Sequence, residues 1–167
     1  MLDNSYGSPM FLTVKDVMVK KVIAIDSDQT VKNAAILMSK HGIGCCIVSK
    51  NDKIVGILTE RDILTRLVAV AGDPDKTTVS EIMSEPAIVV EPSLALDEAV
   101  KLMFVHRIKK LPVVKRSKNQ GKLVGLVTLT DIARVHPQLI KTLKELFEMI
   151  KENPPRSIDK VIRYYIV

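Results

Sequence analysis

Apolar and polar positions along the 167-residue chain predict one strand-and-helix unit near its start. An alternating segment over 22–25 precedes apolar residues spaced three and four apart over 31–38, which predicts a short strand and then a helix. Two apolar runs, 45–48 and 54–58, follow with a polar Asn-Asp pair between them, as is typical of a β-hairpin. A last helix is predicted from Thr59 to about Val70. The unit is therefore β-α-β-β-α.

The same pattern occurs a second time. Val14–Met18 matches Val79–Met83 at an offset of 65 residues, and the offset becomes 69 after the polar stretch 115–122. Four additional residues of that composition belong in a turn between two strands. We predict an α+β fold of two βαββα repeats, over 11–72 and 73–136, which pack together because neither buries much apolar surface alone.

The unrepeated ends of the chain carry different patterns. Apolar residues at helical spacing from Leu139 to Ile150 predict an amphipathic helix within the C-terminal tail, 137–167. Its apolar face favours packing on the chain's own core or on a partner subunit, and a dedicated contact with an effector protein is the alternative. Residues 1–10 are expected to form a flexible tail.

Composition and charge narrow the class of protein. Apolar residues make up 47% of the chain, but no window has the 18 uninterrupted apolar residues of a membrane span, and no secretory pattern begins the sequence. We therefore expect a cytoplasmic globular protein with no membrane partner. The net charge of +6 suits an anionic partner, although a solvated lysine-rich surface would give the same value.

Motifs for catalysis and metal binding are missing from the sequence. It contains no Gly-x-Ser-x-Gly, phosphate-binding Walker loop, His-Glu-x-x-His or Gly-x-Gly-x-x-Gly. The two cysteines, Cys45 and Cys46, are adjacent and cannot supply a four-ligand zinc site. His41 and His106 fall at equivalent helix ends, where a positive group suits the helix dipole. We predict no enzyme activity, no catalytic residue, no metal site and no cofactor.

One polar motif occurs in both repeats. Gly-x-x-Thr-x-x-Asp ends in Thr59 and Asp62 in the first repeat, and in Thr128 and Asp131 in the second. A Thr followed three residues later by an acid, where a strand meets a helix, fits a helix capping box. A short carboxylate held at a helix start could instead accept hydrogen bonds from the two hydroxyls of a ribose, with the Thr facing sugar or phosphate. The residues alone leave both interpretations open.

The repeat resembles the pair of cystathionine-β-synthase (CBS) domains called a Bateman module. The resemblance rests on Thr13–Met18, Thr78–Met83, His106–Val114 and both Gly-x-x-Thr-x-x-Asp segments, and it covers about residues 12–135. It implies two repeats related by a pseudo-two-fold axis, with two clefts that bind an adenosine-containing regulatory ligand such as AMP, ADP, ATP or S-adenosylmethionine. It also implies a homodimer.

The resemblance also assigns residues to the two clefts by position. Asp131 and Asp62 would each hold a ribose, and Thr128 and Thr59 would contact sugar or phosphate. The resemblance implies that the base contacts come from the opposite repeat: Thr13, Met18 and the backbone at Ile43 and Gly44 for the Asp131 cleft; Thr78, Met83 and the backbone at Ile108 and Lys109 for the Asp62 cleft.

The two clefts are expected to differ in charge. Lys109 and Lys110 stand where the family often places a phosphate-binding base, whereas the first repeat has Gly44 and Cys45 there. The Asp131 cleft should therefore favour phosphorylated nucleotides, because a lysine–phosphate contact is charge-assisted. The Asp62 cleft has only Arg61 nearby, and three alternatives stay open for it: weaker binding, no ligand, or a less charged ligand.

These expectations combine into a ligand-sensing regulatory module for signal transduction, which binds an adenine nucleotide and acts on an unknown effector protein in trans. One alternative is a nucleic-acid-binding protein that uses the basic surface, although no base-reading motif is visible and aromatic residues are few. A second alternative is a structural dimer with vestigial clefts, which the presence of both aspartates disfavours.

Overall fold

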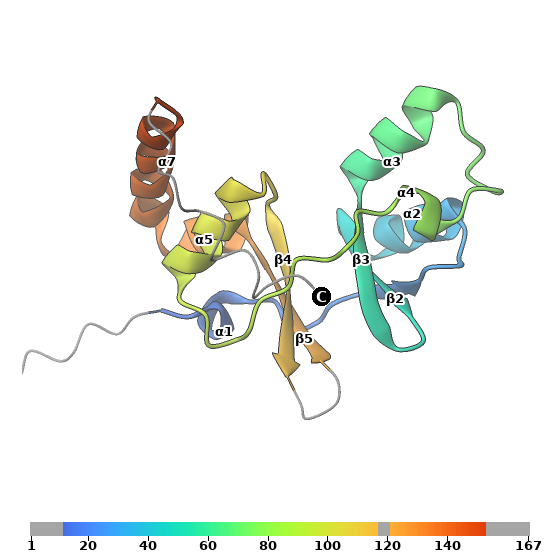
Figure 1. Cartoon of the computed structure of the whole chain (residues 1–167). Coiled ribbons are helices and arrows are strands. Elements are labelled where there is room, and N and C mark those ends of the chain that lie inside the picture. Colours follow the sequence, from blue (N-terminus) through green and yellow to red (C-terminus); the bar gives the residue numbers. More distant parts are fainter. Residues whose placement is uncertain (1–11, 117–120, 153–167) are drawn as a thin grey trace, which may run out of the picture.

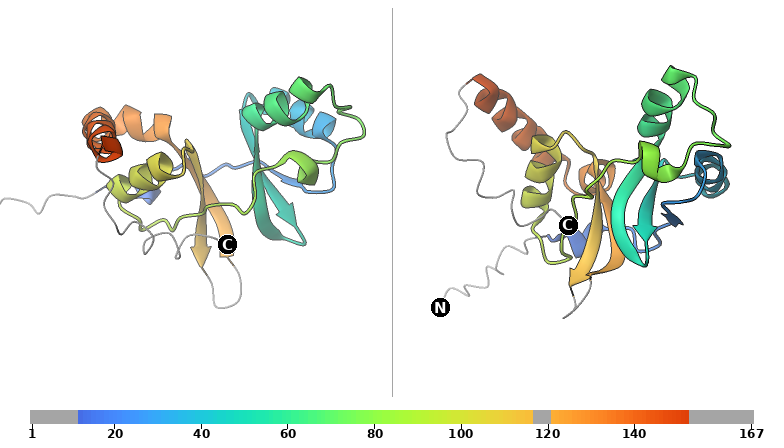
Figure 2. Two further views of the ribbon diagram at one scale, coloured as in Figure 1. Left: turned by 45° about the horizontal axis from the view of Figure 1, so that its top comes forward. Right: turned by 45° about the vertical axis from the view of Figure 1, so that its right-hand side comes forward.

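Two strand-and-helix repeats stand side by side in the computed structural model, which describes residues 12–116 and 121–152. Their sheets meet at the centre of the molecule and their helices lie on the outer sides (Figures 1 and 2). The predicted α+β fold with two repeats is confirmed. The expected N-terminal tail over 1–10, the tip of the second hairpin and the end of the C-terminal tail lie outside the described residues.

Repeat 1 contains a three-stranded sheet in the order β1-β2-β3, with β1 parallel and β3 antiparallel to β2. Its elements are β1 (Ala24–Asp26), α2 (Val31–His41), β2 (Cys45–Lys50), β3 (Lys53–Thr59), α3 (Glu60–Arg66) and a 3-10 turn, η1 (Val68–Val70). Gly42 ends α2 in the left-handed conformation at φ 61°. Asn51 and Asp52 make the predicted hairpin turn at φ 50° and 61°.

Repeat 2 repeats this order with one strand fewer. Its elements are α5 (Leu96–Val105), β4 (Lys110–Arg116), β5 (Gly121–Thr128) and α6 (Leu129–Val135). The strand expected over 87–90 is reduced to isolated bridge residues, Ile88 and Val90, of which Val90 pairs in parallel with Val113. In repeat 1 the Ile47 amide donates to the Ile23 carbonyl at 3.0 Å, but the equivalent of Ile47 is Pro112, which has no N–H to donate.

When repeat 1 is counted from β1 and repeat 2 from α5, the segment that precedes each of them in the chain completes the other one. Helix α1 (Val14–Val17) lies against repeat 2, where the Val14 amide donates to the Leu94 carbonyl at 2.8 Å. Helix α4 (Val79–Ile82) lies against repeat 1, where the Val79 amide donates to the Gln29 carbonyl at 2.8 Å. Figure 1 shows α1 beside β5 and α4 beside α2. Accordingly, Val14 is buried in the core of repeat 2 and Val79 in the core of repeat 1.

The C-terminal helix α7 (Pro137–Glu152) follows the predicted break at His136. It packs against α5 and α6, and Leu139 and Ile140 contact the core of repeat 2. The first turns of this helix therefore lie on the chain's own core, one of the two packings predicted for its apolar face. Within the part of the chain that the structure describes, no helix is both long and apolar enough to cross a membrane.

Candidate functional site

Both Gly-x-x-Thr-x-x-Asp segments form helix capping boxes at the starts of α3 and α6. The amide and the hydroxyl of Thr59 donate to Oδ2 of Asp62 at 2.8 and 2.5 Å, and those of Thr128 donate to Oδ2 of Asp131 at 3.0 and 2.6 Å. The capping interpretation is confirmed. Since Oδ2 and the Thr hydroxyl are engaged in both repeats, a ligand can reach each aspartate only through Oδ1.

The environment of Oδ1 is closed at Asp62. Ser84 Oγ donates to this atom at 3.1 Å, and Arg66 Nη1 lies 3.3 Å away from it. The same Arg66 nitrogen donates to the carbonyls of Ile82 and Met83 at 2.9 and 2.7 Å. The Asp62 side chain is 8% exposed, so the carboxylate is covered by groups of the chain itself.

The environment of Oδ1 is open at Asp131. Among residues 12–116 and 121–152, no hydrogen bond or ion pair reaches this atom, and the residue is only half-buried. The positions equivalent to Ser84 and Arg66 are Val19 and Val135, which carry no donor. The two aspartates therefore share the cap and differ in the second carboxylate oxygen.

Lys110 joins the Asp131 site from the neighbouring strand. It pairs with Thr128 across the β4–β5 ladder, and its ammonium donates to the Gly44 carbonyl of repeat 1 at 2.8 Å. Lys110 is therefore bonded to Gly44 and lies opposite Thr128 of the capping box; its place in a ligand site stays a prediction. Lys109 is exposed, and its carbonyl accepts the Leu129 amide at 2.9 Å.

The motif glycines make room for the exchanged segments. A Cβ at Gly125 would lie 2.6 Å from Met18 Sδ, and one at Gly56 would lie 2.8 Å from Met83 Sδ. A side chain at either glycine would therefore collide with the methionine. Met18 thus lies against the strand that leads to Asp131, and Met83 lies against the strand that leads to Asp62.

Several residues assigned by resemblance have other partners. The hydroxyls of Thr13 and Thr78 donate to Asp16 at 2.8 Å and to Glu81 at 2.7 Å. These threonines hold the pKa of both acids below its ordinary value, chiefly through their backbone amides. Within the described residues, no side-chain hydrogen bond or ion pair joins Thr13 to Asp131. None joins Asp62 to the other residues assigned to its cleft either: Thr78, Ile108, Lys109 and the exposed Arg61.

Sequence reasoning missed Arg66 and Ser84. Arg66 follows Asp62 by four residues on one helix, a spacing that brings opposite charges together and was visible in the sequence. Ser84 reaches Asp62 only because the segment before repeat 2 pairs with β3 through Ile57, so no local pattern indicates it.

The two cysteines are buried at the start of β2. Burial raises the pKa of the Cys45 thiol despite the nearby Lys110 ammonium, and it raises the pKa of Cys46 to about 11. Both residues are therefore thiols near neutral pH and poor nucleophiles. Among the residues that the structure describes, no group of three His, Cys, Asp or Glu side chains could hold a metal ion.

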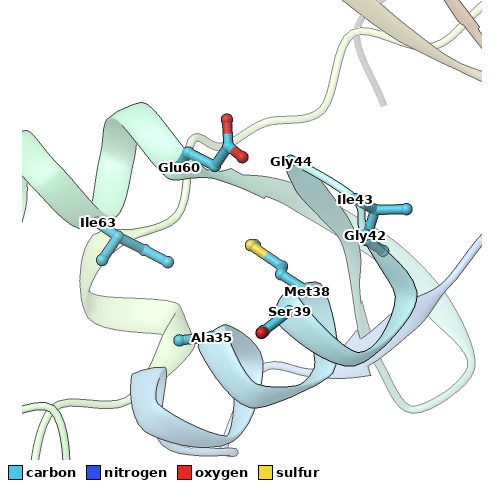
Figure 3. A pocket seen from close by; sticks show the side chains of 8 residues that line it. All are labelled: Ala35, Met38, Ser39, Gly42, Ile43, Gly44, Glu60 and Ile63. Carbon is cyan, nitrogen blue, oxygen red and sulfur yellow. The ribbon is translucent and has the colours of Figure 1, made fainter.

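A pocket of about 390 Å³ lies between α2 and α3 of repeat 1 (Figure 3). It is lined by Ala35, Met38, Ser39, Gly42, Ile43, Gly44, Glu60 and Ile63. Thr59 and Asp62 are not among them, so this pocket is separate from the capping boxes. In repeat 2 the equivalents of Ser39 and Glu60 are Phe104 and Leu129, which are apolar and pack against the core.

Comparison with known proteins gives a family match and several similar chains. The model of the CBS domain matches residues 14–69 and 79–137. An uncharacterized protein of Methanopyrus kandleri, MK0525, is 38% identical over 142 residues, which are 84% of this chain and 71% of that protein. The CBS domain-containing protein YhcV of Bacillus subtilis is 39% identical over 121 residues, 72% of this chain and 83% of its own.

Solved structures show the same arrangement of elements. The CBS domain pair of the protein MJ0100, in complex with 5′-methylthioadenosine and S-adenosyl-L-methionine, superposes with a TM-score of 0.65 at 30% identity, over 77% of this chain and 98% of that one. The hexameric CBS-CP12 protein from bloom-forming cyanobacteria superposes with a TM-score of 0.69 at 29% identity, over 90% and 80%.

Enzymes also appear among the similar proteins. The inosine-5′-monophosphate dehydrogenase of Methanocaldococcus jannaschii is 33% identical over 133 residues, but the match covers only 25% of that enzyme. The similarity therefore concerns about a quarter of the dehydrogenase, and the rest of that enzyme lies outside the match.

Proposed function

The chain belongs to the CBS domain family, and from this membership we propose that it is a regulatory module that senses an adenine nucleotide at Asp131 and acts on an effector protein in trans. The observation that carries the proposal is the open Oδ1 of Asp131 in the first turn of α6. Thr128, which shares the capping box with Asp131, pairs with Lys110 across the sheet. The proposal includes no catalytic role and no resident cofactor.

The chemistry of this site suits a nucleotide. A carboxylate oxygen has two lone pairs, so Oδ1 of Asp131 can accept a hydrogen bond from each hydroxyl of a ribose. The Lys110 ammonium has three donors, of which one goes to the Gly44 carbonyl and one lies toward the Cys45 thiol, so a donor is left for a phosphate. A charge-assisted phosphate contact favours AMP, ADP or ATP over S-adenosylmethionine. The similar protein MJ0100 supports an adenosine-containing ligand, because its CBS domain pair was solved with two of them.

Isothermal titration calorimetry of the purified chain with AMP, ATP, adenosine and S-adenosylmethionine tests the proposal. We expect micromolar binding of AMP, and about tenfold weaker AMP binding in Lys110→Met, because the variant loses a charge-assisted hydrogen bond worth about 1.5 kcal/mol. Adenosine binding should not change in that variant, since adenosine has no phosphate.

Two results would argue against this function. If none of the four ligands gives a binding heat, the chain does not sense an adenine nucleotide. Salt-dependent binding of a DNA or RNA oligonucleotide would favour the nucleic-acid alternative, because counterion release makes such binding weaken steeply with salt.

We also propose that two copies associate through the outer face of repeat 1. Ile36, Leu64 and Val68 are 56%, 60% and 59% exposed there, whereas α7 packs on the corresponding helices of repeat 2. Exposed apolar side chains on the outer helices of a repeat are typical of interaction surfaces. The similar hexameric CBS-CP12 protein supports self-association.

Leu64→Glu is expected to convert the proposed dimer to a monomer, because it places a charge on this apolar face. Sedimentation velocity measures the change. Val105→Glu on α5 is the matched control, since Val105 is also exposed but belongs to repeat 2, and it should remain dimeric. Equal sedimentation of both variants and the parent chain would exclude this face as the interface.

A further inference from the structure

We propose that Arg66 and Ser84 close the Asp62 site, so that the chain takes one adenosine-containing ligand, at Asp131, although both repeats carry the same motif. This inference rests on the proposed function for the identity of the ligand. It adds which of the two sites is available and which residues decide it.

The first step is the count of acceptor positions on Asp62. Oδ2 accepts from the amide and the hydroxyl of Thr59, and Oδ1 accepts from Ser84 and faces Arg66. Each oxygen has two lone pairs, so three of the four accept hydrogen bonds from the chain itself, and the fourth faces the Arg66 guanidinium. A ligand would have to displace a buried hydrogen bond and an ion pair before it could bind.

The second step concerns what holds Arg66 in place. Its Nη1 donates to the carbonyls of Ile82 and Met83, which end α4 and begin the link to repeat 2. Arg66 therefore ties α3 to the exchanged segment while it neutralises Asp62. Displacing it would break these carbonyl contacts together with the ion pair, and the closed state is stabilised as a unit.

The third step is that repeat 2 lacks every part of this arrangement. The equivalents of Ser84 and Arg66 are Val19 and Val135, which are 47% and 53% exposed. Because both valines face solvent, they are not required for the core, and polar substitutions there are tolerated. The difference between the sites thus lies in two exchangeable positions.

Two double variants test the proposal, with the full chain and with AMP and adenosine as probes in titration calorimetry. Arg66→Val with Ser84→Val gives repeat 1 the residues of repeat 2. Val19→Ser with Val135→Arg gives repeat 2 the residues of repeat 1. We expect one ligand per chain for the parent, two for the first variant and none for the second.

Hydrogen exchange gives a readout that does not depend on a ligand. The Ser84 amide donates to the Ile57 carbonyl at 2.9 Å. In the single variant Arg66→Val this amide should exchange faster than in the parent chain, because Arg66 no longer ties α4 to α3. Arg134→Val is the matched control, because Arg134 is an arginine of the equivalent helix α6 that is exposed. It should leave that exchange rate unchanged.

The outcomes separate this inference from the proposed function. A parent chain that binds two ligands, or a first variant that gains no site over the parent, overturns the inference. A parent chain that binds neither probe refutes the proposed function at Asp131, and a site gained by the first variant would still support closure of the Asp62 site. If the first variant does not fold, retained binding in the second variant overturns the inference.

Discussion

Replacing Asp131 with alanine is expected to weaken AMP binding at least 100-fold while costing little stability. The variant removes the acceptor of two ribose hydroxyls, and hydrogen bonds to a charged group are worth about 1.5 kcal/mol or more each, so that their sum of about 3 kcal/mol corresponds to roughly 100-fold. Its capping box is partly exposed, and the loss of such a cap costs about 1 kcal/mol of unfolding free energy. Titration calorimetry and urea unfolding measure the two effects.

Asp62→Ala is the matched control, because it removes the same capping interaction at the start of α3. This control is expected to change AMP affinity little and stability more, the opposite of Asp131→Ala. AMP affinity should stay within about twofold, while stability falls by more than in Asp131→Ala, since Arg66 and Ser84 lose a buried partner. Equal losses of affinity in both variants would contradict the assignment of Asp131 as the ligand site.

The repeated pattern made most of the fold predictable. Spacing of apolar residues located the helices that became α2, α5 and α7, and the polar pair between two apolar runs located the first hairpin. The strand over 87–90 was not predictable from its own residues, which alternate like those of a strand. It fails because Pro112, on the neighbouring strand, cannot donate the hydrogen bond that Ile47 provides in repeat 1.

The residues of the candidate site were predictable from the sequence, but which of the two aspartates is free to bind a ligand was not. The sequence identified the Thr and Asp of each motif and the lysine that meets Gly44. It did not indicate that one aspartate is closed, because Ser84 and Asp62 are 22 residues apart and meet only through the exchanged segment. An aligned pair of repeats does show that the second repeat has valine at both closing positions. That difference acquires meaning only after the contacts are known.

The exchange of segments between the repeats also predicts which half of the molecule a core substitution damages. Val14 and Val79 are both 0% exposed, and each precedes one repeat but is buried in the other. A charged side chain at either position costs several kcal/mol when it is buried without a partner. That loss is a large part of the 5–15 kcal/mol that stabilises a typical domain.

Val14→Asp should therefore expose the amides of α5, β4 and α6, and should leave those of α2 and β2 protected, although Val14 precedes repeat 1. Val79→Asp should do the reverse. Hydrogen exchange measured by mass spectrometry resolves the two repeats, and Lys15→Asp serves as the control because Lys15 lies exposed on the same short helix as Val14. If Val14→Asp instead exposes the amides of α2 and β2, each repeat folds with the segment that adjoins it in the chain. That result would contradict the exchange of segments between the repeats, through which Met18 reaches the Asp131 site and Ser84 reaches Asp62.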